Sequence, residues 1–361
     1  MVDLRMSQPI INLSFLSPQP TGLSVYATNI LPYLSDLNPI AISTAPIPNY
    51  SCHLINTDFT HHSGTRKHLD RLWWTQFQLP KIYHQLKSQL LFSPVPEAPI
   101  FTDCRYIVTA HDFIPLHFPK KFSTSTVYHR YYVPHILNQA QHIICNSQAT
   151  AKDIGDFFDI PTSKITPIPL AYDRQHFQFL NLPTKNYFLY IGRQEAYKNL
   201  RRIISAFCEI PQSQDYELWL VGSTDLRYRP ALDTQITALG MTDRIKFLEY
   251  VHYSDLPKII NQAMALVFPS LWEGFGLPIL EAMACGTPVI TSNLASMPEV
   301  AGDAAILVDP YDTNQIADAM RMVAEDSQLR SKLRQSGLAR AKQFSWEKTG
   351  KATAMVLERY L

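Results

Sequence analysis

The sequence of 361 residues concentrates glycines and two glutamates in one short segment. Residues 272–281 read Trp-Glu-Gly-Phe-Gly-Leu-Pro-Ile-Leu-Glu. Gly274, Gly276 and Gly286 lie close together, although the whole chain has only 12 glycines. Glycine lets a backbone turn tightly or approach a ligand closely, because it carries no Cβ atom. The cluster therefore indicates a functional loop.

The residues around this loop predict a strand, a turn and a helix. An apolar run ends near Pro269, and Pro278 suits the first turn of a helix, where its missing N–H group costs no hydrogen bond. Gly286 is typical of a helix end. A glycine-rich loop that opens a helix exposes backbone amides at the positive end of the helix dipole, which favours binding of an anion.

Two carboxylates flank the loop, Glu273 before the glycines and Glu281 in the expected first turn of the helix. Carboxylates repel an anion, but they accept hydrogen bonds from pairs of neighbouring hydroxyl groups. The combination indicates a ligand that carries both phosphate and sugar, with a hexose and a ribose as the groups that the carboxylates bind. For Glu281, the alternative is a structural charge near a helix N-terminus.

Three further polar residues follow predicted strands, Arg193 and Lys198 in the second half of the chain and His111 in the first. Two cations at one strand end can balance a diphosphate and stabilise it as a leaving group. Each could also be an ordinary surface cation, and a single histidine is more often structural than catalytic. Their place at the ends of strands favours a role in a site.

Short apolar runs alternate with helical stretches along the chain, which predicts parallel βα units. The pattern breaks over the polar residues 173–185 and then restarts. The chain is therefore expected to form two α/β domains with doubly wound, Rossmann-like sheets, residues 1–175 and 176–345. The expected strands are residues 10–15, 106–110, 142–145, 165–169, 187–191, 216–221, 245–248, 263–268 and 288–292.

The composition narrows the class of protein. A net charge of +1, from 32 basic and 31 acidic residues, argues against a nucleic-acid-binding protein. No apolar run reaches the roughly 20 residues that a membrane span requires, and the first residues have no signal-peptide cleavage site. The five cysteines are scattered and form no CxxC motif, which is typical of a reducing compartment. A cytoplasmic protein is expected.

The motif Glu-Gly-Phe-Gly-Leu-Pro-x-x-Glu, with seven residues between its glutamates, resembles the signature of retaining GT-B glycosyltransferases of the family 4 type. The resemblance implies two Rossmann-like domains that face each other across a cleft, with a final helix, about residues 346–361, crossing back to the first domain. It implies that Glu281 binds the nucleotide ribose. It also implies a donor-hexose subsite made by Glu273 and the backbone amides of Gly274, Phe275, Gly276 and Leu277.

Two more segments of the second half support this resemblance. Tyr-Ile-Gly-Arg-Gln-Glu-Ala-Tyr-Lys-Asn is similar to the family block in which Arg193 and Lys198 clamp the donor diphosphate. Arg-Ile-Lys-Phe-Leu-Glu-Tyr-Val is similar to the block whose backbone, around Tyr250 and Val251, cradles the nucleobase. Glu249 stands where the family usually has glycine, so the base contacts and the identity of the base stay open.

In the first half, Gly22 resembles the family's loop after the first strand, which approaches the diphosphate. His111, in Thr-Ala-His-Asp-Phe-Ile-Pro, resembles a histidine near the donor sugar. The resemblance thus implies four catalytic residues, His111, Glu273, Arg193 and Lys198. It implies transfer of a hexose from a nucleotide sugar with retention, no metal ion and no resident cofactor.

Residues 73–76 and 94–99 resemble O-antigen glycosyltransferases, many of them mannosyltransferases, which favours GDP-mannose over a UDP-sugar as the donor. The expected acceptor is a glycan or a lipid-linked glycan. Residues 66–74 combine cations with two tryptophans, so peripheral membrane contact is one interpretation and an ordinary helix with its tryptophans packed inside is the favoured one. The oligomeric state stays open.

Three other functions fit parts of the pattern. A bilobal sugar-binding protein has two α/β lobes, but it normally carries an export signal. A nucleotide-sugar 2-epimerase of the same fold has no need of the two spaced glutamates. An NAD-dependent dehydrogenase requires a third glycine where Ile279 stands.

Overall fold

A computed structural model describes residues 8–16, 21–56, 65–121, 123–210, 216–249 and 251–361, with the backbone alone for residues 65–68. The chain divides into two compact units. Unit 1 comprises Met1–Leu170 and Trp346–Leu361, and unit 2 comprises Ala171–Ser345. The two units are considered one at a time.

Unit 1 contains a seven-stranded sheet whose strands run parallel in the order β3-β2-β1-β4-β5-β6-β7. Every residue of its central strands β1, β4, β5 and β6 is buried, as expected for a parallel sheet with both faces covered. The strands are β1 Ile10–Asn12, β2 Ile40–Ser43, β3 Ser51–Leu54, β4 Leu91–Ser93, β5 Tyr106–Ala110, β6 His142–Cys145 and β7 Ile165–Pro167.

Helices connect these strands. Ser147 caps the start of one of them, because its hydroxyl accepts a hydrogen bond from the Thr150 amide at 3.0 Å. The α-helices of unit 1 are α1 Gly22–Ile30, α2 Thr65–Phe77, α3 Leu79–Gln85, α4 Ile114–His117, α5 Thr124–Val127, α6 Val133–Gln139, α7 Gln148–Phe158 and α15 Trp346–Glu358. The unit also has the short 3-10 helices η1 Leu31–Tyr33, η2 Ser35–Leu37 and η4 Thr162–Lys164 and the π-helix η3 Tyr128–Tyr132.

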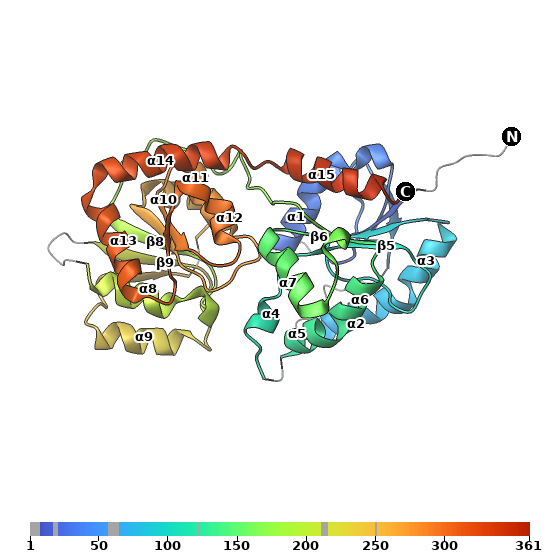
Figure 1. Ribbon diagram of the computed structural model, residues 1–361, viewed down its shortest axis with the longest axis horizontal. Helices are drawn as coiled ribbons and strands as arrows, with labels where there is room; N and C mark the ends of the chain where they lie inside the picture. The colour runs from blue at the N-terminus through green and yellow to red at the C-terminus, as the bar shows by residue number, and fades with distance from the viewer. Residues whose placement is uncertain (1–7, 17–20, 57–64, 122, 211–215, 250) are drawn as a thin grey trace. The chain divides into compact units, whose positions relative to one another are not determined.

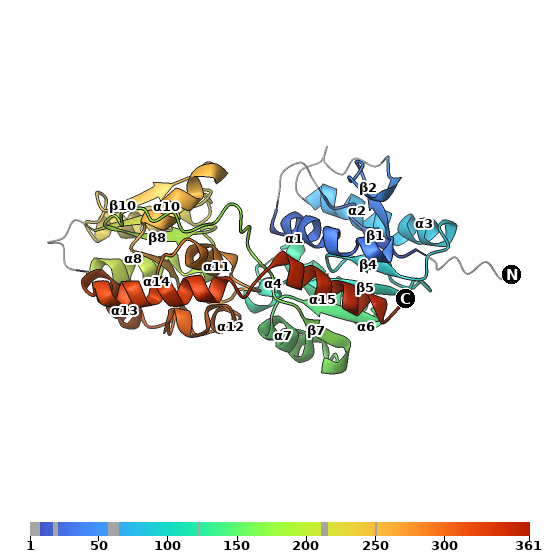
Figure 2. The same cartoon turned by 90° about the horizontal axis from the view of Figure 1, so that it is seen from above.

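The last helix, α15, packs against α1 in unit 1, as both views show (Figures 1 and 2). Side-chain hydrogen bonds fix it there. The Thr349 hydroxyl donates to the Pro169 carbonyl at 2.7 Å, and Arg105 donates to the Tyr360 carbonyl at 2.9 Å. The expectation that the final helix returns to the first domain is therefore confirmed.

Unit 2 contains a six-stranded parallel sheet in the order β10-β9-β8-β11-β12-β13. Its strands are β8 Tyr187–Ile191, β9 Glu217–Val221, β10 Ile245–Leu248, β11 Ala265–Phe268, β12 Val289–Ser292 and β13 Ile306–Val308. Its helices are α8 Leu200–Cys208, α9 Arg229–Ala238, α10 Leu256–Gln262, α11 Leu277–Ala284, α12 Met297–Ala301, α13 Thr313–Glu325 and α14 Ser327–Ala341, with the turns η5 Ala196–Lys198, η7 Tyr253–Asp255 and η8 Gly302–Ala304.

The prediction of two Rossmann-like domains is confirmed, although it missed the strands β2, β3, β4 and β13. β3 and β13 are the outermost strands of their sheets and have partly exposed side chains. β2 and β4 have four and three residues, and no local feature separates them from the strands of equal length that were predicted. Among the described residues, no helix combines the length and the apolar character that crossing a membrane requires.

Candidate functional site

The glycine loop of unit 2 joins β11 to α11 as the sequence predicts. Gly276 is the residue before α11 and has φ +99°, a backbone conformation that side chains other than glycine rarely adopt. Pro278 lies in the first helical turn, and Gly286, with φ +73°, follows the helix end. Pro278 has no N–H group, and the Ile279 amide donates to the Gly276 carbonyl at 3.0 Å. The Leu277 amide and the positive end of the helix dipole are therefore the features of this helix start that suit an anion.

Lys198 and Glu273, which lie 75 positions apart in the sequence, meet at this loop. The Lys198 ammonium donates to Glu273 Oε1 at 2.6 Å, and only 13% and 10% of the two side chains are exposed. The contact forms because β8, which precedes Lys198, pairs with β11, which precedes Glu273. The ammonium also lies 5.3 Å from the centre of the Phe268 ring. The pair brings one cation and one carboxylate to the start of α11.

Two buried side chains that the sequence analysis missed hold the loop in place. The Ser296 hydroxyl lies 2.8 Å from the Glu273 carbonyl and 2.9 Å from the Phe275 carbonyl. The Asn199 amide donates to the Pro269 and Pro310 carbonyls at 3.0 and 2.6 Å. Asn199 has φ +66°, and an asparagine between a loop and a helix is a usable sequence signal for that conformation. Ser296 gives no such signal.

Glu281 lies in the second turn of α11 and not in the first, so the expected position was wrong. The helix begins at Leu277, one residue before the proline that suggested its start, which makes Glu281 the fifth helical residue. Burial raises the pKa of the Glu281 carboxyl to about 7, and the negative charge of Asp173 adds to the shift. The buried site therefore favours the protonated form of this carboxyl, compared with an exposed glutamate.

An aromatic stack lies beside the carboxyls of Glu281 and Asp173. Burial, followed by the charges of Asp173 and Glu281, raises the pKa of Tyr253 to about 12. The rings of His176 and Tyr253 are parallel, with centres 3.8 Å apart, and His176 Nε2 donates to the Tyr253 carbonyl at 2.8 Å. Asp173 Oδ1 accepts from the His176 amide at 3.1 Å. These contacts place an aromatic surface and two carboxyls together in unit 2.

The other residues of unit 2 that were predicted to bind the nucleotide sugar have fewer contacts with the rest of the site. Arg193 is exposed, its carbonyl accepts from the Tyr190 hydroxyl at 2.7 Å, and no ion pair within the described part of the chain involves its guanidinium. Val251 is half-buried in the loop after β10. Tyr250 lies outside the described residues.

Glu249, where glycine was expected, forms a polar cluster of its own. Its Oε1 accepts from the Thr224 hydroxyl at 2.6 Å and from Arg229 at 3.2 Å. The Arg229 guanidinium lies 3.6 Å from the centre of the Phe247 ring. The carboxylate thus reaches the loop after β9.

Two glycines after neighbouring strands make a close backbone contact that the sequence analysis missed. Gly192 follows β8 and Gly222 follows β9, with φ of +151° and +148°. A Cβ atom on Gly222 would overlap the Gly192 carbonyl oxygen. Both glycines directly follow an apolar strand, which is a sequence signal for this position.

In unit 1, Gly22 is the exposed first residue of α1, and a Cβ atom there would meet open space. Thr21 caps this helix, because its hydroxyl accepts from the Ser24 amide at 3.3 Å and the Ser24 side chain accepts from the Thr21 amide at 2.6 Å. The fold alone therefore does not require glycine at position 22.

His111 follows β5, as predicted, and both of its ring nitrogens contact the protein. Nε2 lies 2.7 Å from the Pro94 carbonyl oxygen, and Nδ1 lies 3.1 Å from the side-chain amide of Asn146. Its ring contacts that of Tyr26 edge-on, with centres 4.9 Å apart. Burial lowers the pKa of His111 below its ordinary value of 6.5. A catalytic role for His111 stays a prediction.

The two tryptophans of α2 differ. Trp74 is 5% exposed and packs in the core, as favoured, but Trp73 is 59% exposed, so the favoured interpretation was wrong for Trp73. Leu69, Trp73 and Phe77, four residues apart, form an exposed apolar stripe along the helix, which we call the α2 stripe. Arg71 of the same helix pairs with the Glu97 carboxylate through two of its nitrogens.

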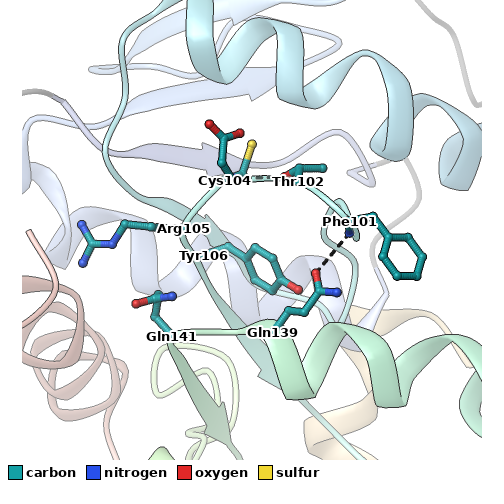
Figure 3. Close-up of a pocket in the computed structure, with 8 residues that line it drawn as sticks. Phe101, Thr102, Cys104, Arg105, Tyr106, Gln139 and Gln141 are labelled. Atoms are coloured by element: carbon teal, nitrogen blue, oxygen red, sulfur yellow. Dashed lines mark hydrogen bonds between the residues drawn. The ribbon is translucent and has the colours of Figure 1, made fainter.

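A cavity of about 740 Å³ lies at the amino end of β5, the edge of the sheet opposite to His111 (Figure 3). None of the predicted site residues lines it. Beside it, within the described ranges, His84, Asp103 and Cys104 place their potential metal-ligand atoms within 4.8 Å of one another. The cavity is lined by Phe101, Thr102, Asp103, Cys104, Arg105, Tyr106, Gln139 and Gln141.

Comparison with known proteins identifies relatives of both units. The family model "Glycosyltransferase Family 4" matches residues 21–176, and "Glycosyl transferases group 1" matches residues 172–340. The chain is 35% identical to O-antigen chain mannosyltransferase B of Escherichia coli over 223 residues, which is 58% of each chain. It is 26% identical to O-antigen chain mannosyltransferase RfbU of Salmonella typhimurium over 88% of this chain and 91% of that protein.

A similar solved structure is the sucrose-phosphate synthase of Thermosynechococcus elongatus. It superposes with a TM-score of 0.79 at 20% identity and covers 98% of both chains. At 20% sequence identity, this similarity shows a shared fold and nothing more. The chain spans little more than half the length of the first of the curated relatives.

Proposed function

Because the chain belongs to the glycosyltransferases of group 1 and family 4, we propose that it transfers a mannosyl residue from GDP-mannose to a hydroxyl group of a glycan or lipid-linked acceptor, with retention. The buried Lys198–Glu273 pair at the start of α11 is the observation that carries this proposal. The names of the two O-antigen mannosyltransferases support the sugar and the kind of acceptor.

The pair offers hydrogen bonds of both kinds to a nucleotide sugar. An ammonium group has three donors, and only one of those of Lys198 goes to Glu273 Oε1, so the others can reach phosphate oxygens. Glu273 Oε2 can accept from a sugar hydroxyl. The amides of Gly274 to Leu277 and the positive end of α11 add to the stabilisation of the departing diphosphate. Arg193 is the second cation proposed for the diphosphate.

The proposed reaction breaks the bond between the anomeric carbon and the phosphate oxygen and forms one to the acceptor oxygen on the same face of the sugar. The acceptor proton moves to the leaving phosphate oxygen. Positive charge develops on the sugar and negative charge on the diphosphate. Lys198 and Arg193 act on the diphosphate in place of a divalent ion, so we expect turnover to persist in EDTA.

Glu281 is proposed to bind the ribose hydroxyls, and the loop of Tyr250 and Val251 the base. The test is calorimetric titration of the purified protein with GDP, UDP and ADP in the presence of EDTA. We expect tight binding of GDP and its loss in Arg193→Ala. Arg201→Ala, which removes an exposed arginine of α8, is the matched control and is expected to bind normally. Equally weak binding of all three nucleotides would contradict the proposal.

We further propose that the enzyme works at the cytoplasmic face of a membrane, and the α2 stripe supports this. An exposed tryptophan flanked by leucine and phenylalanine favours the interface of a bilayer. Co-sedimentation with anionic vesicles is expected to fall in Trp73→Ser and to stay unchanged in Tyr311→Ser, which removes an exposed aromatic ring of unit 2. If both variants bind the vesicles equally well, the α2 stripe does not contact the membrane.

A further inference from the structure

Three neighbouring strand ends of unit 1 converge on the His111 ring. Pro94 follows β4, His111 follows β5 and Asn146 follows β6. Nε2 of the ring contacts the Pro94 carbonyl at 2.7 Å, and the Asn146 side-chain nitrogen contacts Nδ1 at 3.1 Å and the His111 carbonyl at 3.2 Å. Asn146 is 4% exposed. The ring is therefore fixed from both sides by groups that are themselves fixed by the sheet.

These contacts determine the protonation of the ring. A carbonyl oxygen only accepts, so Nε2 must carry a hydrogen to bond to Pro94. The Asn146 amide nitrogen also contacts the His111 carbonyl, so it is the donor end of that side chain, and a donor facing Nδ1 requires Nδ1 to be without a hydrogen. The network fits neutral imidazole with its hydrogen on Nε2, and it excludes the doubly protonated ring.

The orientation of the Asn146 side chain leaves its carbonyl oxygen without a partner among the described residues, which indicates that the contacts with the His111 ring determine this orientation. The Asn146 carbonyl oxygen is buried, and no hydrogen-bond donor within the described part of the chain reaches it. A buried acceptor without a partner is unfavourable, because the hydrogen bonds that it made to water in the unfolded chain are not replaced. Rotating the amide by half a turn would place this oxygen against the His111 carbonyl oxygen. The two contacts to His111 thus decide the orientation.

The groups around the ring are neutral with one exception. Tyr26 of α1 lies against it, and burial raises the pKa of Tyr26 to about 12, so it is uncharged. Cys145 of β6 is buried, and its Sγ lies 3.5 Å from the Ser147 carbonyl oxygen. The Asp112 carboxylate, next in the chain, favours a charged imidazole, but it also accepts from the Ile114 amide at 3.1 Å. Burial is the largest influence on the His111 pKa and lowers it, and it outweighs the contacts with Pro94, Asp112 and Asn146, which act in the opposite direction.

We propose that Asn146 is a positioning residue that holds His111 as the neutral, Nε2-protonated ring beside the donor sugar. This inference rests on the proposed function, with His111 near the donor sugar as the sequence resemblance implies. A neutral ring adds no positive charge near the sugar, where positive charge develops during transfer. The cations then remain on the diphosphate, where Lys198 and Arg193 are proposed to act.

Asn146→Asp tests the proposal, because a carboxylate in this place accepts from Nδ1 and so favours the imidazolium. We expect NMR of protein labelled in histidine to show the His111 pKa raised above 6.5, from its lowered value in the native chain. We expect kcat at neutral pH to fall roughly tenfold or more, to recover at higher pH, and KM for the donor to change less. Asn138→Asp, at an exposed position of α6, is the matched control.

Asn146→Ser, which keeps a small donor, covers the case in which the aspartate variant does not fold, and it is expected to retain the neutral ring and most of the turnover. An unchanged His111 pKa in Asn146→Asp, or a raised pKa with native kcat at every pH, would overturn the proposal. The NMR readout needs no substrate. A protein that shows the expected pKa change but binds no nucleotide would instead refute the proposed function.

Discussion

The carboxyl edges of the two sheets have the same architecture, but the groups that they carry differ: those described in unit 2 are charged, and those in unit 1 are mainly neutral. In unit 2 this edge holds charged groups, the buried Lys198–Glu273 pair and the neighbouring carboxyls of Glu281 and Asp173. In unit 1 it holds a network around a neutral ring, built by His111 and Asn146. A parallel sheet fixes where the loops stand, and the side chains in those loops decide the chemistry.

The difference predicts how each edge responds to substitution. Removing one partner of a buried ion pair leaves an uncompensated charge, which is costly to both stability and binding. Removing one partner of a neutral hydrogen bond costs less and changes mainly the orientation of its neighbour. The variants below test this contrast, beginning with the largest expected effect.

Lys198→Ala is expected to have the largest effect of all. It leaves the Glu273 carboxylate buried without its partner, so the free energy of unfolding should fall by about 3 to 5 kcal/mol. It also removes a cation from the proposed diphosphate site, so kcat/KM should fall by at least about 100-fold. Urea denaturation and initial rates measure the two losses.

A double variant, Lys198→Met with Glu273→Gln, separates these losses. It removes both charges and keeps similar side-chain volumes, so we expect most of the stability to return and the activity to stay absent. Native turnover by a stable double variant would show that the pair is structural only.

Gly222→Ala tests the close backbone contact at the same edge. The added Cβ atom would overlap the Gly192 carbonyl oxygen, so β8 and β9 must separate, and we expect a loss of about 2 to 4 kcal/mol together with weaker GDP binding. Gly240→Ala is the control, since it has φ +66° but open space around it, and about 1 kcal/mol is expected there. Equal losses at the two positions would show that strain, and not the strand contact, is decisive.

Glu281→Gln is expected to have an intermediate effect that depends on pH. The folded pKa of about 7 lies above the ordinary value of 4.5, so the native state holds a proton that the unfolded chain loses. Native stability therefore falls as the pH rises from 4.5 to 7, and the cost is fully present above 7. Without ligand, Glu281→Gln should be more stable than the native chain by about 1 to 3 kcal/mol at pH 8 and equal to it at pH 4.

Ionisation of Glu281 lowers the stability of the protein without ligand, but it should favour the binding of ligand. Ribose hydroxyls donate best to the ionised carboxylate, so GDP affinity of the native chain should rise with pH through 7 more steeply than that of Glu281→Gln. Thermal denaturation across this range, with and without GDP, measures both effects. If GDP affinity depends on pH in the same way in both proteins, Glu281 does not bind the ribose.

Sequence patterns predicted the elements and the local chemistry but not the contacts between distant segments. The sequence predicts the bounds of β5, β6, β8 and β10, and β5 and β8 are short apolar runs with clear limits. The Lys198–Glu273 contact depends on β8 pairing with β11, an order in the sheet that no local pattern reveals. The contact of Asn146 with His111 depends in the same way on β5 pairing with β6, and neither residue type alone indicates it.

The smallest effect is expected for Glu249→Gly, which restores the residue usual in the family. The Glu249 carboxylate is 59% exposed, and its bonds to Thr224 and Arg229 lie at the surface, so the change in unfolding free energy should stay below about 1 kcal/mol. Removing a negative charge from this edge should tighten GDP binding two- to threefold, roughly, at low salt and should have little effect at high salt, because exposed charges are screened. Calorimetry at two ionic strengths measures this. A loss of GDP affinity that persists at high salt would show instead that Glu249 contacts the base directly, and the charged edge of unit 2 would then include the nucleobase site.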